Sequence, residues 1–296
     1  MSVDADYGDL LLQKDDPHPI KRHLSLYARR RLRRAISIAK RPVPLLRRKF
    51  AARTSLTSDL DMQVRPSDGY AVLPENFIKD LAPVMELAHR KWAEHRERMA
   101  QANHYFLKFS HFMPLHEFGP VVNVALQDNV LKLASDYIGG IPVLKDLNIW
   151  WTRPSNVRTG AQNFHIDSIP DTRSLRIFVA LTDIDLNNGP LTFLPASRTA
   201  EIVKEMGYLG GTINSDWVYR NCQQEMIVAT CKRGQAVALD TDRCLHMGST
   251  NMTKDRLVLS ISFSSAYLNK KFQDQSAFAA AVTNRKDLAP LVLNLR

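Results

Sequence analysis

Two stretches in the first half of the chain repeat apolar residues every three to four positions. The repeat runs from Pro74 to Ala102 and again from Val121 to Ile138, which predicts two amphipathic helices. Gly139 and Gly140 follow the second stretch directly and are typical of a helix end. We therefore expect a layer of helices over residues 74–138, ahead of the rest of the fold.

After this layer the pattern changes to short β-rich runs that are separated by turn residues. These runs are Leu147–Thr152, Asn163–Asp167, Leu175–Ile184, Pro190–Leu194, Gln235–Asp240 and Leu257–Tyr267. Many strands after leading helices predict a mainly β fold, an antiparallel sandwich or barrel with a helical buttress. We expect one domain over residues 61–296 with its core at about 144–268. The interval at about 198–232 is expected to be an inserted lid over the functional site.

Residues 1–60 differ in charge from this domain. The chain has a net charge of +10, and twelve Lys or Arg without one acidic residue lie within residues 21–50. Residues 1–20 carry five Asp against one Lys, so residues 51–296 have a net charge of only about +2. We expect residues 1–60 to be an acidic and then basic extension, partly disordered or helical.

The basic part of the extension predicts a helix over residues 21–40 that ends at Pro42 and Pro44. A basic amphipathic helix can lie on an anionic membrane surface or bind an acidic partner. The same pattern suits a solvated helix that packs on the domain by its apolar stripe, and both interpretations remain open. Nucleic-acid binding is disfavoured, because Tyr27 and Phe50 are the only aromatic residues in the basic segment.

Composition agrees with a globular protein, with 45% hydrophobic and 24% charged residues. The sequence contains no apolar run near the ~20 residues that a membrane span requires, and its first thirty residues do not resemble a signal peptide. Three cysteines indicate a reducing compartment without a disulfide framework. We expect a cytoplasmic protein, which the basic segment can hold at a membrane surface.

Three residues form a candidate metal site. His165 and Asp167 are two positions apart, so on a strand their side chains would point to the same side. With His246 from a distant strand they make the two-histidine, one-carboxylate set that binds Fe(II) and leaves open positions for chemistry. Arg256, ten residues later, can clamp a carboxylate beside the metal. Cys244 is expected to be a small core residue rather than a ligand.

The sequence around these residues resembles the phytanoyl-CoA dioxygenase family of Fe(II)/2-oxoglutarate oxygenases. The resemblance lies in the strand-like run Leu175–Ile184, in Asn187–Ser197 with its Asn-Asn-Gly-Pro turn, in the glycine-led Arg233–Asp240, and in His246–Asn251. It covers roughly residues 144–267. Arg198 departs from the family pattern, which usually has a histidine at this position after a Pro-Gly-Ser turn.

The resemblance implies a double-stranded β-helix, the cupin-like jelly roll. Iron would be held by His165, Asp167 and His246, and the distal carboxylate of 2-oxoglutarate by Arg256. Phe178 would line the co-substrate pocket, and Ser249 or Ser260 would bond the same carboxylate. The implied activity is hydroxylation of a small-molecule or lipid-linked substrate with O2, while 2-oxoglutarate becomes succinate. Related halogenases lack the carboxylate ligand, so Asp167 favours hydroxylation, or a desaturation or ring closure by the same oxidant, over halogenation.

Two other functions remain open at this point. The first is a cupin that holds another metal. The second is a jelly-roll interaction protein that the basic helix recruits to an anionic membrane or an acidic carrier. Arg256 speaks against the first function, because a cupin with another metal does not need a clamp for 2-oxoglutarate. The intact set of three ligands speaks against the second, although it leaves recruitment open as an additional function. On the strand before the site, Asn148 and Trp150 can face the pocket, although Trp150 and Trp151 are expected to be core residues.

Overall fold

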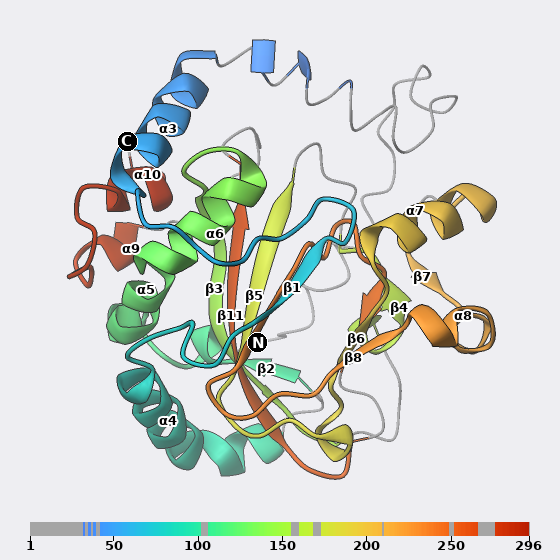
Figure 1. Ribbon diagram of the computed structural model, residues 1–296. Coiled ribbons are helices and arrows are strands. Elements are labelled where there is room, and N and C mark those ends of the chain that lie inside the picture. The colour runs from blue at the N-terminus through green and yellow to red at the C-terminus, as the bar shows by residue number, and fades with distance from the viewer. Residues whose placement is uncertain are drawn as a thin grey trace, which may run out of the picture.

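Two antiparallel β-sheets face each other in the centre of the computed structural model (Figure 1). The structure describes residues 42–101, 106–154, 160–167, 173–208, 210–248, 252–265 and 276–295, together with residues 32, 35, 36, 38 and 39. Within these residues the larger sheet has six strands and the smaller sheet has five. Every strand pairing in both sheets is antiparallel.

The chain alternates between the two sheets, which makes the fold a jelly roll. The larger sheet has the order β1 (Tyr70–Leu73), β9 (Ala236–Leu239), β5 (Ser174–Ala180), β11 (Arg256–Ser264), β3 (Val143–Thr152) and β2 (Phe106–Lys108). The smaller sheet has the order β7 (Thr212–Ile213), β4 (Phe164–His165), β10 (His246–Met247), β6 (Leu191–Phe193) and β8 (Ile227–Ala229). From β3 to β6, and again from β8 to β11, each strand lies in the sheet opposite to its predecessor. The expected mainly β fold is therefore confirmed.

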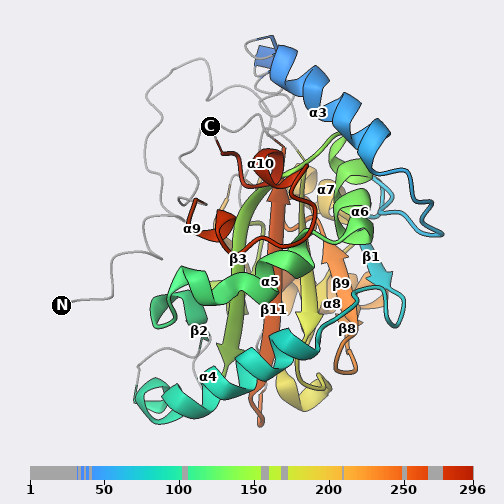
Figure 2. The same ribbon diagram turned by 90° about the vertical axis from the view of Figure 1, so that its left-hand side faces the viewer.

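Helices cover the outer face of the larger sheet (Figure 2). They are α4 (Ala82–Ala100), α5 (Gly119–Ala125), α6 (Asp128–Ile138), α9 (Ser276–Ala279) and α10 (Ala289–Val292). Side chains on this face of the strands, such as Ile149, Ile177 and Leu259, join the helices in one large apolar cluster. Its members alternate along each strand with residues that face the other sheet, as the twofold repeat of a strand requires. The buttress thus stabilises one face and leaves the inner face for the site.

The two predicted helices of this layer are shorter than their apolar repeats. The first begins at Ala82 rather than Pro74, because Asp80 has a left-handed backbone with φ 50°. The second is divided into α5 and α6 at Gln127, which is extended and whose side-chain amide bonds both backbone groups of Lys79. The apolar repeat continues through this break, so the repeat alone does not reveal it.

The helix at the N-terminal end of the described residues differs from the sequence-based prediction. Pro42 and Pro44 were expected to end a helix, but both lie within α3 (Pro42–Ser55). Proline is accepted in a first helical turn, because the N–H groups of that turn have no acceptor within the helix. The predicted helix over residues 21–40 lies outside the described residues, except that residues 32, 35, 36, 38 and 39 are helical. The helix α3 packs beside α10 and α6 at one end of the larger sheet (Figure 1).

The segment expected to be a lid covers the outside of the smaller sheet instead. It forms α7 (Ala196–Glu205) and α8 (Ser215–Cys222) and contributes β7 and β8 to that sheet. Both helices lie on the face of the smaller sheet that is turned away from the larger sheet (Figure 1). Their apolar residues pack against Phe164, Leu245 and Met247. This segment therefore supplies the second hydrophobic layer of the sandwich. Short 3-10 turns complete the described chain at Phe109–His111, Leu115–Phe118, Gly160–Gln162, Leu186–Asn188 and Gln223–Glu225.

Candidate metal centre

The structure brings together the three predicted ligands, which lie far apart in the sequence. His165 on β4 and His246 on β10 are direct partners across the two strands. Asp167 follows β4, and its Oδ1 lies 3.3 Å from Nε2 of His165 and 3.5 Å from Nε2 of His246. One ligand atom from each residue lies within 4.8 Å of the other two. A single metal ion can therefore bind all three.

The alternation of side chains along the strands turns these ligands inward. Phe164 and Ile166, the neighbours of His165, point into the outer apolar cluster. Leu245 and Met247 do the same on either side of His246. Burial of these four apolar side chains fixes the register of β4 and β10, because a slip by one residue would turn the histidines outward.

Each histidine is oriented by a backbone carbonyl two residues before it. Nδ1 of His165 lies 2.8 Å from the carbonyl oxygen of Asn163, and Nδ1 of His246 lies 3.0 Å from that of Cys244. A carbonyl only accepts hydrogen bonds, so both Nδ1 atoms carry the proton and both Nε2 lone pairs are available to a metal. The backbone N–H of Asp167 donates to the carbonyl of Thr241 over 3.1 Å, which ties the carboxylate to the loop before β10.

The charges of the site favour an ionised carboxylate. Burial would raise the pKa of Asp167, but the charge of Arg176 and the proximity of both histidine rings outweigh it and hold that pKa well below its usual value. Burial also opposes protonation of His165, yet its bond to Asp167 raises the pKa of His165 overall. The pKa of His246 is lowered by its burial and by the neighbouring His165.

Arg176 is a residue of this site that the sequence analysis missed. Its Nη1 lies 3.0 Å from Oδ2 of Asp167, and its guanidinium lies 5.4 Å and 5.9 Å from the ring centres of Trp150 and Phe178. A signal was present, because an arginine interrupts the otherwise apolar strand Leu175–Ala180. Its position two residues before Phe178 also puts both side chains on the inner face.

Arg256, the predicted clamp, begins β11 and is 8% exposed. Its Nη1 donates to the carbonyl of Gly189. Gly248, two residues after His246, leaves space for the guanidinium, since a Cβ atom there would lie 3.2 Å from Nη2 of Arg256. The guanidinium therefore lies close to the chain segment that carries the distal histidine.

Several buried polar atoms on the inner face of the larger sheet are available to a ligand. Thr152 is paired with Arg256 in the sheet, Trp150 with Val258, and Ser260 with Phe178. The polar side-chain atoms of Trp150, Thr152 and Ser260 have no hydrogen-bond partner within the described part of the chain. Such atoms are costly to bury unless they bond a ligand or water. This inner face thus fits a polar acid such as 2-oxoglutarate, as the three ligands fit iron.

The other residues that were expected to line the pocket lie in different environments. Phe178 lies on the inner face, with its ring 5.8 Å from that of Trp150. Ser249 lies outside the described residues. Trp151 is a core residue whose Nε1 donates to Asp255, whereas Trp150 belongs to the inner face. Asn148 bonds the backbone and hydroxyl of Ser110 and so secures the edge of the pocket.

Comparison with known families decides the identity of this site. The family model for phytanoyl-CoA dioxygenase (PhyH) matches residues 70–258, nearly two thirds of the chain. The chain belongs to the phytanoyl-CoA dioxygenase family. As a member with an inward His-Asp-His group, it is an oxygenase that uses iron, 2-oxoglutarate and O2, as the sequence analysis expected. The match begins at β1 and excludes α3.

Solved structures with a similar fold have low sequence identity to this dioxygenase-family chain. The epimerase SnoN, in complex with Fe3+, alpha ketoglutarate and nogalamycin RO, is 19% identical, with 76% of this chain and 85% of SnoN covered and a TM-score of 0.44. HygX from Streptomyces hygroscopicus with nickel and 2-oxoglutarate bound is 13% identical, with coverages of 68% and 85% and a TM-score of 0.45. EctD from S. alaskensis with 2-oxoglutarate and 5-hydroxyectoine is 14% identical, with coverages of 81% and 88% and a TM-score of 0.47. No curated protein matches the chain.

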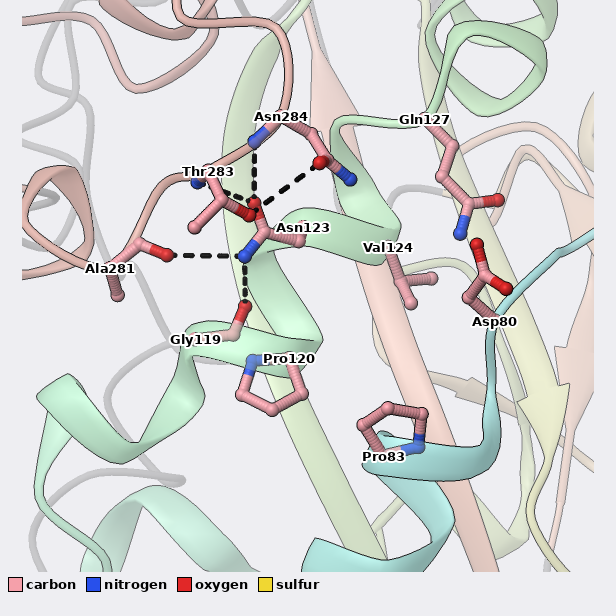
Figure 3. A pocket seen from close by; sticks show the side chains of 10 residues that line it. All are labelled: Asp80, Pro83, Gly119, Pro120, Asn123, Val124, Gln127, Ala281, Thr283 and Asn284. Carbon is pink, nitrogen blue, oxygen red and sulfur yellow. Dashed lines mark hydrogen bonds between the residues drawn. The ribbon is translucent and has the colours of Figure 1, made fainter.

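A separate hollow on the helical side contains none of these residues (Figure 3). Pro83 and Pro120 form one side of it, and Asn123 lies at its centre. The amide of Asn123 donates to Ala281 and accepts from the backbone N–H groups of Thr283 and Asn284. This hollow thus marks where α5 holds the C-terminal segment. No helix in the described part of the family member is long and apolar enough to cross a membrane.

Proposed function

We propose that this oxygenase hydroxylates an unactivated C–H bond of a small-molecule or lipid-linked substrate. The observation that carries the proposal is the combination of the His165, Asp167 and His246 group with the buried Arg256 behind it. An iron site without a co-substrate clamp would not need a buried guanidinium at the start of β11. In the proposed reaction one oxygen atom of O2 enters the substrate as a hydroxyl group. The other enters succinate, and CO2 is released.

The proposed roles follow from the positions of the side chains. His165, Asp167 and His246 would hold iron, which when bound with 2-oxoglutarate and O2 supplies the oxidation of the C–H bond. Arg256 would pair with the distal carboxylate of 2-oxoglutarate, and Ser260 would donate its hydroxyl to the same group. Phe178, opposite Ser260 in the sheet, would exclude water from the co-substrate.

Asp167 supports hydroxylation over halogenation. Its carboxylate occupies a ligand position that a halide would need, and the Arg176 ion pair keeps the carboxylate ionised. An interaction protein without catalysis is disfavoured. The intact ligand group and the backbone carbonyls that orient both histidines are unexpected in a site that has lost its metal.

The first test is anaerobic addition of Fe(II) and 2-oxoglutarate to the full-length protein. We expect a weak visible absorption band and a stabilisation of about 2.7 kcal/mol at a hundredfold excess of ligand over its Kd. His246→Ala should lose the band and the stabilisation. Absence of both effects in the wild-type protein would exclude the oxygenase.

Arg256 is tested separately by its co-substrate affinity. Arg256→Met should weaken 2-oxoglutarate binding by about a hundredfold or more, because one partner of a buried charge pair is removed. Arg256→Lys keeps the charge without the planar guanidinium, so its affinity for 2-oxoglutarate should lie between those of the wild type and Arg256→Met. Metal binding measured without 2-oxoglutarate should be similar in all three proteins. Equal 2-oxoglutarate affinity in wild type and Arg256→Met would assign the clamp to another residue.

The substrate is best sought by succinate release. A metabolite extract and a lipid extract, supplied separately, should reveal which fraction raises succinate formation above the uncoupled rate. Mass spectrometry should then find a product that is heavier by one oxygen atom. Loss of two hydrogen atoms instead would identify a desaturation or ring closure and contradict the proposed hydroxylation.

A further inference from the structure

The helix α3 carries an apolar ridge that points away from the protein. Val43, Leu46 and Phe50 are 72%, 65% and 70% exposed. They lie three and four positions apart, so they form one continuous line along the helix. Single exposed apolar residues are ordinary on protein surfaces, but a contiguous line of large ones marks an interaction site. Leu32, Ile36 and Ile38, which are also helical, are exposed as well.

Positive charges flank this ridge on both sides. At 100° per residue, Lys49 and Arg53 lie on one side of the line through Val43, Leu46 and Phe50, and Arg47 lies on the other. All three cationic residues are exposed. The sequence of α3 contains no acidic residue. The outward face of α3 is therefore apolar along its centre and cationic along its edges.

The opposite face of α3 fixes this orientation. Arg48, 7% exposed, donates through Nη1 to the carbonyls of Ile141 and Pro142 at 3.1 Å and 3.3 Å, and through Nη2 to that of Leu291 at 2.8 Å. The N–H of Ile141 returns a hydrogen bond to the carbonyl of Arg48 over 3.2 Å. Rotation of α3 to bury its ridge would break all of these bonds. The ridge is thus held outward by the fold.

A lipid surface is the occupant that this face fits best. A second copy of the chain would bring the cations of two α3 helices together, and three side chains are far too few for the ~800 Å² per partner of a stable protein interface. An acidic protein would satisfy the charges but would not need the apolar centre. The boundary of an anionic bilayer satisfies both, since apolar residues enter the acyl region while Lys and Arg reach the headgroups.

We propose that α3 docks the protein on the surface of a membrane that carries anionic lipids. Val43, Leu46 and Phe50 enter the interface, and Arg47, Lys49 and Arg53 contact the headgroups. This docking depends on neither the metal nor 2-oxoglutarate, so it can be tested independently of the proposed reaction. It would hold the oxygenase next to lipid-linked substrates.

The test is co-sedimentation of the full-length protein with vesicles of two compositions. One is phosphatidylcholine alone, and the other contains about one third phosphatidylglycerol. We expect binding to the anionic vesicles only, weakened by added salt. Leu46→Ser with Phe50→Ser should lower the partition coefficient about tenfold or more, because two apolar side chains no longer enter the bilayer. Lys49→Gln should lower it about fivefold.

Matched variants elsewhere on the surface serve as controls. Leu186→Ser removes an equally exposed apolar side chain, and Lys232→Gln removes a charge from a side chain that is 79% exposed. Both should bind anionic vesicles like the wild type, and all variants should unfold at the wild-type urea concentration. Equal binding to both vesicle types, or unchanged binding of the Leu46→Ser and Phe50→Ser variant, would overturn the proposal. A wild-type dimer that this variant converts to a monomer would assign the ridge to a second copy and overturn it too.

Discussion

The ion pair between Arg176 and Asp167 leads to a measurable prediction about the metal centre. Nη1 of Arg176 lies 3.0 Å from Oδ2 of the carboxylate, and the two side chains are 15% and 21% exposed. Arg176→Met removes the charge but keeps an unbranched side chain that can still pack against Trp150 and Phe178. Arg176→Lys keeps the charge and loses the planar group.

The cost of this substitution follows from the partial burial of the pair. Removing one partner of a fully buried ion pair costs ~3–5 kcal/mol. Water still reaches part of both side chains here, and His165 and His246 remain within 3.5 Å of the carboxylate. We therefore expect the metal-free Arg176→Met protein to lose about 2 kcal/mol of unfolding free energy. Arg176→Lys should lose less than about 1 kcal/mol.

A bound divalent cation should reduce this loss. The cation places positive charge beside Asp167 and so replaces part of what Arg176 supplied. We expect the destabilisation to be about 1 kcal/mol smaller with metal bound, which by linkage means that Arg176→Met binds the metal about fivefold more tightly. Urea unfolding with and without Ni²⁺ measures the first quantity, and titration calorimetry measures the second.

Two results would refute this reasoning. Equal unfolding free energies for the metal-free wild type and Arg176→Met would mean that the ion pair contributes nothing to stability. Weaker metal binding by Arg176→Met would mean that Arg176 mainly orients Asp167, and that its repulsion of the cation is the smaller effect.

Three further predictions concern the groups around the ligands. Metal affinity should fall as the pH is lowered through the raised pKa of His165, because a protonated Nε2 cannot bind the ion. Calorimetric titrations at several pH values measure this affinity. The same affinity well above and well below pH ~6.5 would contradict the prediction. Tyr137→Phe removes the hydroxyl that donates to the buried Asp240 over 2.6 Å, and should lower the unfolding free energy by about 2 kcal/mol in urea. A loss below about 0.5 kcal/mol would mean that another donor takes the place of the Tyr137 hydroxyl at Asp240. Gly69→Ala should cost more than about 2 kcal/mol, because Gly69 has φ 73° and a Cβ atom there would lie 2.7 Å from Sγ of Cys244. Cys244→Ala in the same protein should recover part of that loss, and no recovery would place the strain in the backbone or in the 2.8 Å contact of the new Cβ with Cβ of Ala196.

The parts of this site that could be predicted are those set by local spacing. His165 and Asp167 are two residues apart, and a strand turns both to one side. The three ligands also have chemically distinctive side chains. Cys244, expected to be a core residue, lies in the loop before β10, is fully buried against Gly69 and is not part of the ligand group. Burial raises the pKa of its thiol well above the usual value, which keeps it protonated.

The features that were missed depend on contacts between distant segments. Arg176 belongs to the site because β4 and β5 lie in opposite sheets and bring its guanidinium to Asp167. The segment at 198–232 covers the outside of the smaller sheet because its apolar residues meet Phe164 and Met247, which no local pattern reveals. The helix that contains Pro42 and Pro44 was missed because a proline suits the first turn of a helix as well as its end.

The separation of the two faces of the larger sheet has a consequence for how this protein can change. The largest apolar cluster lies on the outer face and contains none of the ligand or pocket residues. Substitutions at Trp150, Phe178 or Val258 on the inner face therefore alter the pocket without opening a cavity in that cluster. The outer cluster therefore keeps its contribution to the unfolding free energy when pocket residues are substituted to alter reactivity. Laboratory evolution of new substrate ranges should accordingly begin with the inner residues of β3, β5 and β11.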